Sequence, residues 1–356
     1  MDSKFHKEIP IPKKYNKRGI TSRLDKVEIL CQEVNNALAN FDCPKILYTL
    51  LVKECLDSIC MHTKKINFED ACKLLENKPK SELSIQLASY MKGLKLVQKL
   101  SNMSDLNPSL IEKINYYVEK GYGKIKGESG HLRKRQNWIG KKGCTFAEAL
   151  HYPPAPEKVP ILLDKLIHFL STNIDPYVAT SIFFGYFLDI HPFMDGNGRT
   201  ARILISGVIK QKKILSSPIL FLTRYFHIHR EKYLRGLHEI RITQSWTNWV
   251  RFFLRGLEFE LILLKKNIHE LHRLDTKLSN LLADIKASTL RNIKGFLYTH
   301  PFFTLEDLKK LKMSKDVNHT WLLRRLINAK VIVKKKKNYY EVSILKKIGS
   351  KKINPD

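Results

Sequence analysis

Twelve consecutive residues, His191 to Arg202, bring more chemically distinct side chains together than any other stretch of the sequence, in the order HPFMDGNGRTAR. An imidazole titrates near neutral pH, so His191 is a candidate general base for a hydroxyl that attacks phosphorus. Asp195 offers one hard oxygen, and Mg²⁺ commonly binds one or two carboxylates together with substrate phosphates. The run therefore combines a candidate base with a candidate metal ligand.

The second half of the run predicts a phosphate site at the start of a helix. Gly196 and Gly198 leave the backbone around Asn197 uncrowded, and the apolar spacing that follows predicts a helix. The first amides of a helix lack internal acceptors and lie at the positive end of its dipole, so they can bind phosphate oxygens. Arg199 and Arg202 share one helical face, where their guanidinium groups would bind the β- and γ-phosphates of a nucleotide. These features together predict nucleotidyl transfer.

The run also resembles the signature of the Fic family, His-Pro-Phe-x-(Asp/Glu)-Gly-Asn-Gly-Arg-x-x-Arg, at every defined position. Fic proteins typically transfer AMP from ATP to a Ser, Thr or Tyr hydroxyl of a protein. The resemblance thus implies ATP and Mg²⁺ as cofactors and His191, Asn197 and Arg199 as catalytic residues. The related Doc kinases have Lys where Gly198 stands, so this glycine favours nucleotidyl over phosphoryl transfer. A turn with a capping asparagine and two solvated arginines is the alternative interpretation.

Length and composition indicate more than one folded unit, because 356 residues with 43% hydrophobic residues exceed one usual domain. No N-terminal stretch resembles a signal peptide, and no apolar run is long enough to span a bilayer, so we expect a soluble protein without a membrane partner. The six cysteines show no metal-ligand spacing. They predict buried thiols in a reducing, cytoplasmic compartment.

The charge balance is strongly positive, with 63 Lys and Arg residues against 34 Asp and Glu residues and a net charge of +29. Such a field attracts polyanions, including nucleic acids. An AT-rich genome would also favour lysine, isoleucine and asparagine without selection for a partner. The composition leaves both explanations open.

The N-terminal part of the chain divides into an arm and a helical region. Residues 1–20 contain prolines and basic residues without apolar periodicity, which predicts a flexible basic arm. Residues 21–105 predict a helical region, in which Asn67 caps one helix. The expected helices span residues 24–38, 44–56, 67–77 and 83–100.

Many Fic proteins carry an inhibitory helix in this region, with the motif (Ser/Thr)-x-x-x-Glu-(Gly/Asn). The sequence resembles it at Ser58, but His62 stands in the place of the glutamate and Thr63 in the place of the Gly or Asn. In such relatives the glutamate approaches the second arginine of the signature, here Arg202. The departure predicts that ATP binds without an activating partner, and His62 is otherwise an ordinary helix residue.

Glycine punctuation and short β-compatible runs between residues 121 and 156 predict a β-hairpin near residues 132–150. The hairpin resembles the flap of Fic proteins, which implies that its edge docks a protein substrate by adding a strand. A simple surface hairpin is the alternative. The residues that carry the resemblance are Gly130, Arg133, Trp138, Ile139, Gly140, Pro153 and Pro154.

Two further stretches build the predicted catalytic core, residues 106–265. Asp175 and Pro176 predict the start of a helix that reaches residue 188, and aromatic residues on more than one of its faces predict burial. That helix would deliver His191 at its end. The stretch from residue 221 resembles the helices that complete the core of Fic proteins. This resemblance places Tyr233 either beside the adenine or in the packing of these helices.

The C-terminal part predicts a connecting helix over residues 266–288, a winged helix over 289–345 and a basic tail over 346–356. Apolar spacing indicates three short helices before the hairpin VIVKKKKNYYEV, with Lys334 to Lys337 in its turn. In helix-turn-helix proteins the second helix, here residues 314–328 with Arg324 and Arg325, enters the major groove. Winged helices also dock proteins, so a DNA partner remains an open alternative.

The sequence as a whole predicts a mainly α protein with a Fic-type helical core, a β-hairpin flap and a C-terminal winged helix. Its predicted activity is protein adenylylation with ATP and Mg²⁺. The alternatives are transfer of another nucleotide and a DNA-binding regulator whose core only senses a nucleotide. The target protein and the oligomeric state, including a homodimer, are left open.

Overall fold

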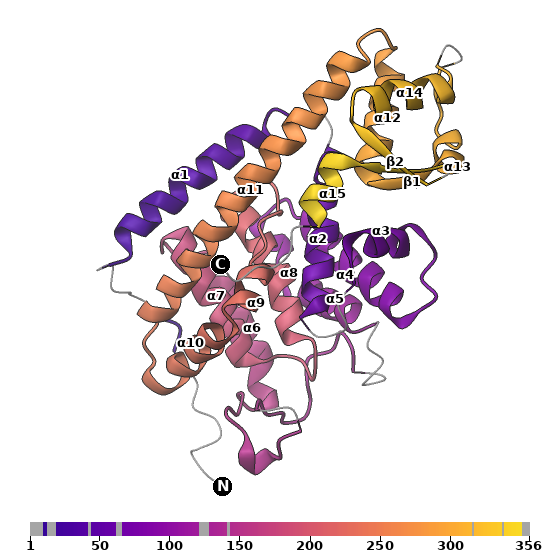
Figure 1. Ribbon diagram of the computed structural model, residues 1–356. Coiled ribbons are helices and arrows are strands. Elements are labelled where there is room, and N and C mark those ends of the chain that lie inside the picture. Colours follow the sequence, from indigo (N-terminus) through magenta and orange to yellow (C-terminus); the bar gives the residue numbers. More distant parts are fainter. Residues whose placement is uncertain are drawn as a thin grey trace. The chain divides into compact units, whose positions relative to one another are not determined.

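The computed structural model describes residues 10–12, 19–41, 44–61, 66–120, 128–140, 143–314, 317–336 and 338–350. Most of these residues are helical, and their one sheet has three strands, which confirms the predicted mainly α class (Figure 1). The helices are α1 (Thr21–Leu38), α2 (Tyr48–Cys60), α3 (Phe68–Glu76), α4 (Glu82–Gln98), α5 (Pro108–Glu119), α6 (Val159–Phe169), α7 (Pro176–Ile190), α8 (Asn197–Gln211), α9 (Thr223–Ile228), α10 (Arg230–Thr243), α11 (Thr247–Leu281), α12 (Ala287–Thr299), α13 (Leu305–Lys309), α14 (His319–Asn328) and α15 (Ser343–Gly349), and the strands are β1 (Phe302–Thr304), β2 (Ile332–Lys336) and β3 (Tyr339–Val342).

The chain forms two compact units, each assembled from two separate segments. Unit 1 comprises Met1–Cys31 with Ser89–Leu261, and unit 2 comprises Gln32–Ala88 with Ile262–Asp356. The domains predicted from the sequence are instead consecutive stretches, and their boundaries stay a prediction. Helix α11 continues through residue 265, so the predicted core and connecting helix share one uninterrupted helix.

Helix α7 is the centre of unit 1. The Asp175 side chain accepts hydrogen bonds from the amides of Tyr177 and Val178, which confirms the predicted cap and start of this helix. Almost every residue of α7 is buried, as its aromatic composition predicted. Phe184 stacks on Phe226 and on Trp249, with ring centroids 5.0 and 6.2 Å apart. This packing fixes the end of α7, after which His191 follows.

Helix α8 packs against both α7 and α5 in unit 1. It begins at Asn197, directly after Gly196, which has the left-handed backbone conformation that glycine adopts without strain. The apolar residues of α8 are buried, so the helix start lies on a firmly packed element. This arrangement confirms the prediction that a helix begins inside the signature.

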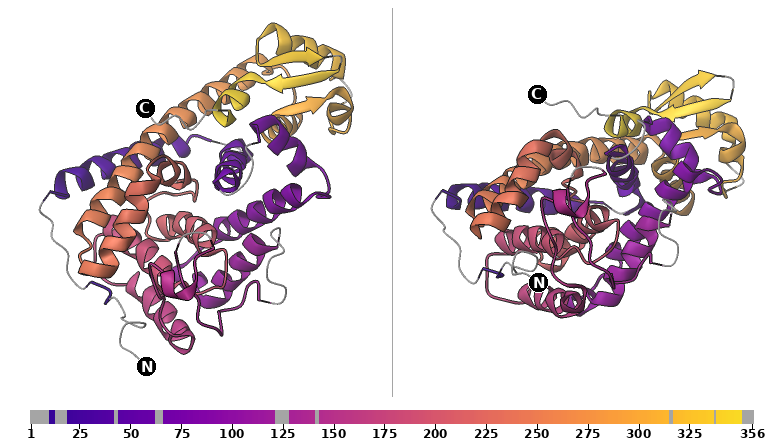
Figure 2. Two further views of the ribbon diagram at one scale, coloured as in Figure 1. Left: turned by 60° about the horizontal axis from the view of Figure 1, so that its bottom comes forward. Right: turned by 90° about the horizontal axis from the view of Figure 1, so that it is seen from below.

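Unit 2 contains the sheet, in which β3 pairs antiparallel with both β1 and β2 (Figure 2). The three predicted short helices and the hairpin that follows them are confirmed as α12, α13, α14 and β2–β3. The predicted start of the third helix at residue 314 is wrong. Helix α14 begins at His319, because the Asn318 side chain accepts the amides of Thr320 and Trp321 and caps it there.

The N-terminal helices agree with the sequence pattern to within a few residues, and Asn67 caps α3 as predicted. His62 and Thr63 lie outside the described residues, and so do most of the predicted arm and residues 351–356 of the predicted tail. Ser58 is buried in α2. Among the described helices, none combines the length and the apolar character that a bilayer crossing requires.

Candidate active site

His191 directly follows the last turn of α7 and adopts a left-handed backbone conformation, with φ of 49°. Its Nδ1 lies 3.4 Å from the carbonyl oxygen of Leu188. If Nδ1 carries the proton in this contact, Nε2 is left as an acceptor. Burial lowers the pKa of His191 to about 3, and the positive charge of Arg241 acts in the same direction. The imidazole is therefore neutral at physiological pH and able to accept a proton.

Asn197 holds the turn between His191 and α8 in place. Its Oδ1 accepts the amide of Phe193 at 2.9 Å, and its Nδ2 donates to the carbonyl oxygen of Phe193 at 2.8 Å. Both polar atoms of the side chain are thus engaged inside the signature itself. This geometry gives the Asn197 side chain a positioning role and leaves its backbone amide for a ligand.

The start of α8 has the features of an anion site. The amides of Asn197 and Gly198 belong to the first turn and have no acceptor within the helix, and Gly196 provides no side chain to cap them. The Gly196 amide itself donates to Oδ1 of Asp195 at 2.6 Å, so the free amides begin one residue later than expected. A side chain at Gly198 would meet only Arg202, 3.4 Å away, which leaves space beside that guanidinium.

Arg199 is held by two carboxylates. Its Nη2 lies 2.8 Å from Oε1 of Glu119 and 3.3 Å from Oδ1 of Asp195. Arg199 and Glu119 are both nearly inaccessible to solvent, so their attraction is only weakly screened. Glu119 could not be identified from the sequence, because nothing in the local pattern shows that α5 turns this carboxylate toward the signature.

Asn115, also on α5, was missed for the same reason. Its Nδ2 donates to the carbonyl oxygen of Asp195 at 3.0 Å and to Oγ1 of Thr200 at 3.2 Å, while its Oδ1 accepts the amide of Gly130. The Gly196 backbone lies so close to α5 that a Cβ there would come within 2.9 Å of Asn115. This close approach explains why the position holds glycine.

Tyr233 belongs to the aromatic packing of unit 1. Its ring stacks on Phe226, with centroids 5.0 Å apart, and also contacts Phe184 and Trp249. Burial raises the pKa of Tyr233 to about 12, and the charge of Arg202 opposes this rise. The packing role that the sequence left open is therefore present, and the adenine contact stays a prediction.

Asp195 is the predicted metal ligand, and its side chain is 38% exposed. Among the described residues, no group of three or more His, Cys, Asp or Glu side chains is arranged to hold a metal ion. The accessible carboxylate of Asp195, next to the start of α8, still fits Mg²⁺ that takes its other ligands from a nucleotide and from water.

The flap is attached to the signature through Arg133, a deeply buried residue. Its Nε donates to the carbonyl oxygen of His191 at 2.9 Å, its backbone amide donates to that of Pro192 at 2.9 Å, and its Nη2 donates to that of Pro154. Burial lowers the pKa of Arg133 to about 10, so the guanidinium stays charged at neutral pH. One arginine thus joins both arms of the flap to the residues around the base.

The predicted hairpin of residues 132–150 is present only as a single antiparallel bridge in the described part of the flap. Ile139 and His151 exchange backbone hydrogen bonds of 2.9 and 3.0 Å, and no strand extends from them. Beyond the bridge, apolar side chains face solvent, with Trp138 43%, Phe146 40% and Leu150 62% exposed. The flap therefore offers an apolar surface as well as backbone groups.

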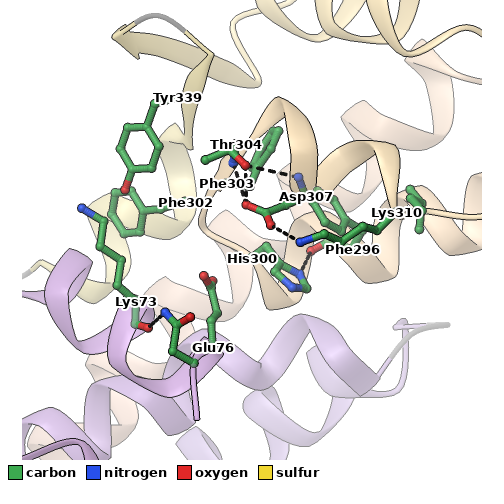
Figure 3. A pocket seen from close by; sticks show the side chains of 12 residues that line it. Lys73, Glu76, Phe296, His300, Phe302, Phe303, Thr304, Asp307, Lys310 and Tyr339 are labelled. Carbon is green, nitrogen blue, oxygen red and sulfur yellow. Dashed lines mark hydrogen bonds and ion pairs between the residues drawn. The ribbon is translucent and has the colours of Figure 1, made fainter. Parts of the chain in front are cut away.

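A pocket of about 520 Å³ lies in unit 2, and none of its lining residues belongs to the signature (Figure 3). Most of its charges are already balanced, since Lys73 pairs with Glu69 at 2.7 Å and Lys310 with Asp307 at 3.0 Å. Burial and the charge of Asp307 raise the pKa of Glu76, which faces this space, to about 7. The pocket lacks the base and the helix start of unit 1, so we place the candidate active site at the signature.

Comparison with known proteins agrees with this choice, because residues 105–208 match the model of the Fic/DOC family. The chain carries a Fic-family domain. The match includes α5, the flap, α7 and the whole signature, so it covers the elements that build the site. It confirms the family resemblance seen in the sequence.

Curated relatives share this Fic domain. The protein adenylyltransferase Fic of Drosophila virilis is 28% identical over 119 residues, which are 30% of this chain and 23% of that protein. A probable protein adenylyltransferase of Aquifex aeolicus is 28% identical over 198 residues, 53% of this chain and 55% of its own. The chain thus spans little more than half of one relative and less than a quarter of the other.

Solved structures extend the likeness in fold. A Fic family protein from Desulfovibrio desulfuricans superposes with a TM-score of 0.56 at 15% identity, over 89% of this chain and 95% of that one. A Fic domain-containing signalling protein from Bacteroides thetaiotaomicron has a TM-score of 0.51 at 17% identity and covers 68% of this chain and 98% of its own. The predicted Fic-type fold is confirmed.

The contact between Glu119 and Arg199 leads to a prediction about anion binding. In Glu119→Gln the full negative charge beside Arg199 is lost, so ATP or inorganic triphosphate should bind about tenfold more tightly, the size of one charged hydrogen bond. Isothermal titration calorimetry measures this change. Glu112→Gln, on the same helix but bonded to the amide of Leu132, is the matched control and should bind as the wild type does. Weaker binding by Glu119→Gln would mean that Glu119 orients Arg199 for phosphate.

Proposed function

We propose that this chain transfers AMP from ATP to a Ser, Thr or Tyr hydroxyl of a protein. The observation that carries the proposal is an intact Fic signature in which the neutral, partly buried His191 ends α7 and the uncapped start of α8 follows at Asn197. The named adenylyltransferases among the relatives support the same chemistry. Transfer of a different nucleotide by the same groups is the nearest alternative.

In the proposed reaction the target hydroxyl oxygen attacks the α-phosphorus while its proton passes to Nε2 of His191. The bond between the α-phosphorus and the bridging oxygen breaks, and pyrophosphate leaves. The amides of Asn197 and Gly198 would stabilise the charge on the α-phosphate, and Arg199 and Arg202 would bind the outer phosphates. Mg²⁺ bound at Asp195 would neutralise part of the phosphate charge.

The flap would dock the protein substrate. An extended segment of the target would pair along the flap beside the Ile139–His151 bridge, and the exposed side chains of Trp138, Phe146 and Leu150 would offer apolar contacts. Main-chain pairing makes few demands on the target sequence. The apolar side chains of the flap would instead favour targets with apolar residues beside the modified hydroxyl. The identity of the target is open.

The test of the proposed chemistry is His191→Ala. This variant should lose label transfer from ATP to proteins by at least a thousandfold while binding ATP nearly as the wild type does, because the base acts only in the chemical step. Mass spectrometry of protein and lysate incubated with labelled ATP locates the modification. His168→Ala, an exposed histidine on α6, is the control and should transfer normally. Equal transfer by His191→Ala and the wild type would contradict the role of His191 as the general base.

We infer a second candidate function, DNA contact, for the C-terminal segment of unit 2 as a winged helix. Arg324 on α14 and Lys334 and Lys336 on β2 are exposed, whereas Arg325 is held by Asp284 at 2.7 Å and stacks over Trp321. Exposed cations of this kind contact phosphates, whereas Arg325 is already engaged. The exposure of Arg324, Lys334 and Lys336 is the observation that favours DNA contact.

The double variant Arg324→Glu with Lys334→Glu should weaken salt-sensitive retention on duplex DNA but leave protein labelling unchanged. The loss of two phosphate contacts should flatten the dependence of log affinity on log salt by about two units. Fluorescence anisotropy at several salt concentrations measures it. Arg273→Glu with Lys277→Glu on α11 changes the same charge and should keep DNA binding. If the wild type shows no salt-dependent binding, the segment does not contact DNA.

A further inference from the structure

A buried group of polar residues lies directly behind His191, and the proposed reaction does not use it. Asp189 is in the last turn of α7, two residues before His191, and only 4% exposed. Its Oδ1 accepts from Nε of Arg241 on α10 at 3.2 Å and lies 3.1 Å from Nε2 of His151 in the flap. Three separate elements of unit 1 therefore meet at one carboxylate.

The group reaches the base through a shared carbonyl. Nη2 of Arg241 lies 3.5 Å from the carbonyl oxygen of Leu188, and Nδ1 of His191 lies 3.4 Å from the same oxygen. Carbonyls in the last turn of a helix lack intrahelical donors, so this oxygen depends on such partners. Arg241 is therefore placed to fix the acceptor that orients the imidazole.

The same group reaches the flap through His151. This residue pairs with Ile139 in the bridge that closes the flap, and its Nε2 also lies 3.2 Å from the carbonyl oxygen of Asp189. Burial lowers the pKa of His151 to about 2, so the ring is neutral and can donate Nε2–H to Asp189. Asp189 thus ties the flap to the end of α7.

Charge couples the group to the base as well. Arg241 disfavours the imidazolium form of His191, and Asp189 offsets part of that effect because it pairs with Arg241. Burial raises the pKa of Asp189 to about 6, and Arg241 opposes this rise, so the carboxylate is mostly ionised above neutral pH. The other charged groups that act on His191 are Arg133 of the flap, which also disfavours the imidazolium, and Asp195, which favours it.

We propose that Arg241 and Asp189 are positioning residues: Arg241 orients His191 through the Leu188 carbonyl, and Asp189 anchors the flap to the end of α7 through His151. The proposal rests on the proposed function of His191 as a base. These residues lie outside the signature, and their hydrogen bonds form one path from the flap to the imidazole.

The first arm of the test follows the titration of His191 itself by NMR, with the imidazole isotopically labelled. Arg241→Gln removes the adjacent charge and should raise the pKa of His191 by about one unit or more, the scale of one nearby charge. The acid limb of the pH–rate profile for automodification should move to higher pH by the same amount. Arg241→Lys keeps the charge and should restore the wild-type titration, and Arg235→Gln, an exposed arginine on the same helix, should change nothing.

The second arm follows the flap by hydrogen–deuterium exchange. Asp189→Asn should speed exchange of the Ile139 and His151 amides by about tenfold, since their anchor loses its charge. It should not raise the pKa of His191, which separates its role from that of Arg241. This variant also keeps the test open if Arg241→Gln does not fold.

Unchanged His191 titration in folded Arg241→Gln, or unchanged flap exchange in folded Asp189→Asn, would overturn the corresponding part of the proposal. Both readouts are independent of catalysis. If His191→Ala transfers label as well as the wild type but the titration and exchange shifts appear, the proposed function fails while the positioning network stands.

Discussion

The buried end of helix α7 is the constraint on which the site depends. Its last carbonyls and those of the following turn have no donors within a helix, and burial removes water as a substitute. Several of them accept hydrogen bonds from side chains of unit 1. Arg241 meets the carbonyl of Leu188, His151 that of Asp189, Arg133 those of Ile190 and His191, and Asn137 and Asn197 that of Phe193.

The same contacts that satisfy the backbone also build the candidate chemistry. Because polar groups must converge on the end of α7, the flap, α10 and the start of α8 are held around His191, and their cations sit where the negative end of the helix dipole favours them. His191 caps this end, and the positive start of α8, where an anion is favoured, follows at Asn197. Packing and these hydrogen bonds thereby hold the candidate base and the candidate anion site in unit 1.

The sequence predicted those parts of the structure whose signals are local. Apolar spacing and capping residues such as Asp175 and Asn67 located the helices, and the composition of residues 191–202 located the site. The parts it did not predict depend on residues far apart in the chain. Glu119 and Arg199 are 80 positions apart and Arg241 and Asp189 are 52, and no local periodicity reports such contacts.

The flap is a second part of the structure that the sequence did not predict correctly. Glycines and β-compatible residues predicted a hairpin, yet the described residues hold one bridge. The backbone amide of Arg133 donates to the carbonyl oxygen of Pro192 in the signature instead of across a ladder. β-propensity measures fit to a pleated surface, and here tertiary contacts to α7 override it. The regulatory motif around His62 lies outside the described residues, so its effect stays a prediction of the sequence.

The proposed chemistry is transfer of a nucleotidyl group to a protein with release of pyrophosphate. Incubating the protein in parallel with ATP labelled at the α-phosphate and ATP labelled at the γ-phosphate tests it most directly. Attack on the α-phosphorus predicts protein-bound label only from the α-labelled nucleotide. Protein-bound label from the γ-labelled nucleotide would show phosphoryl transfer and would contradict nucleotidyl transfer at this site.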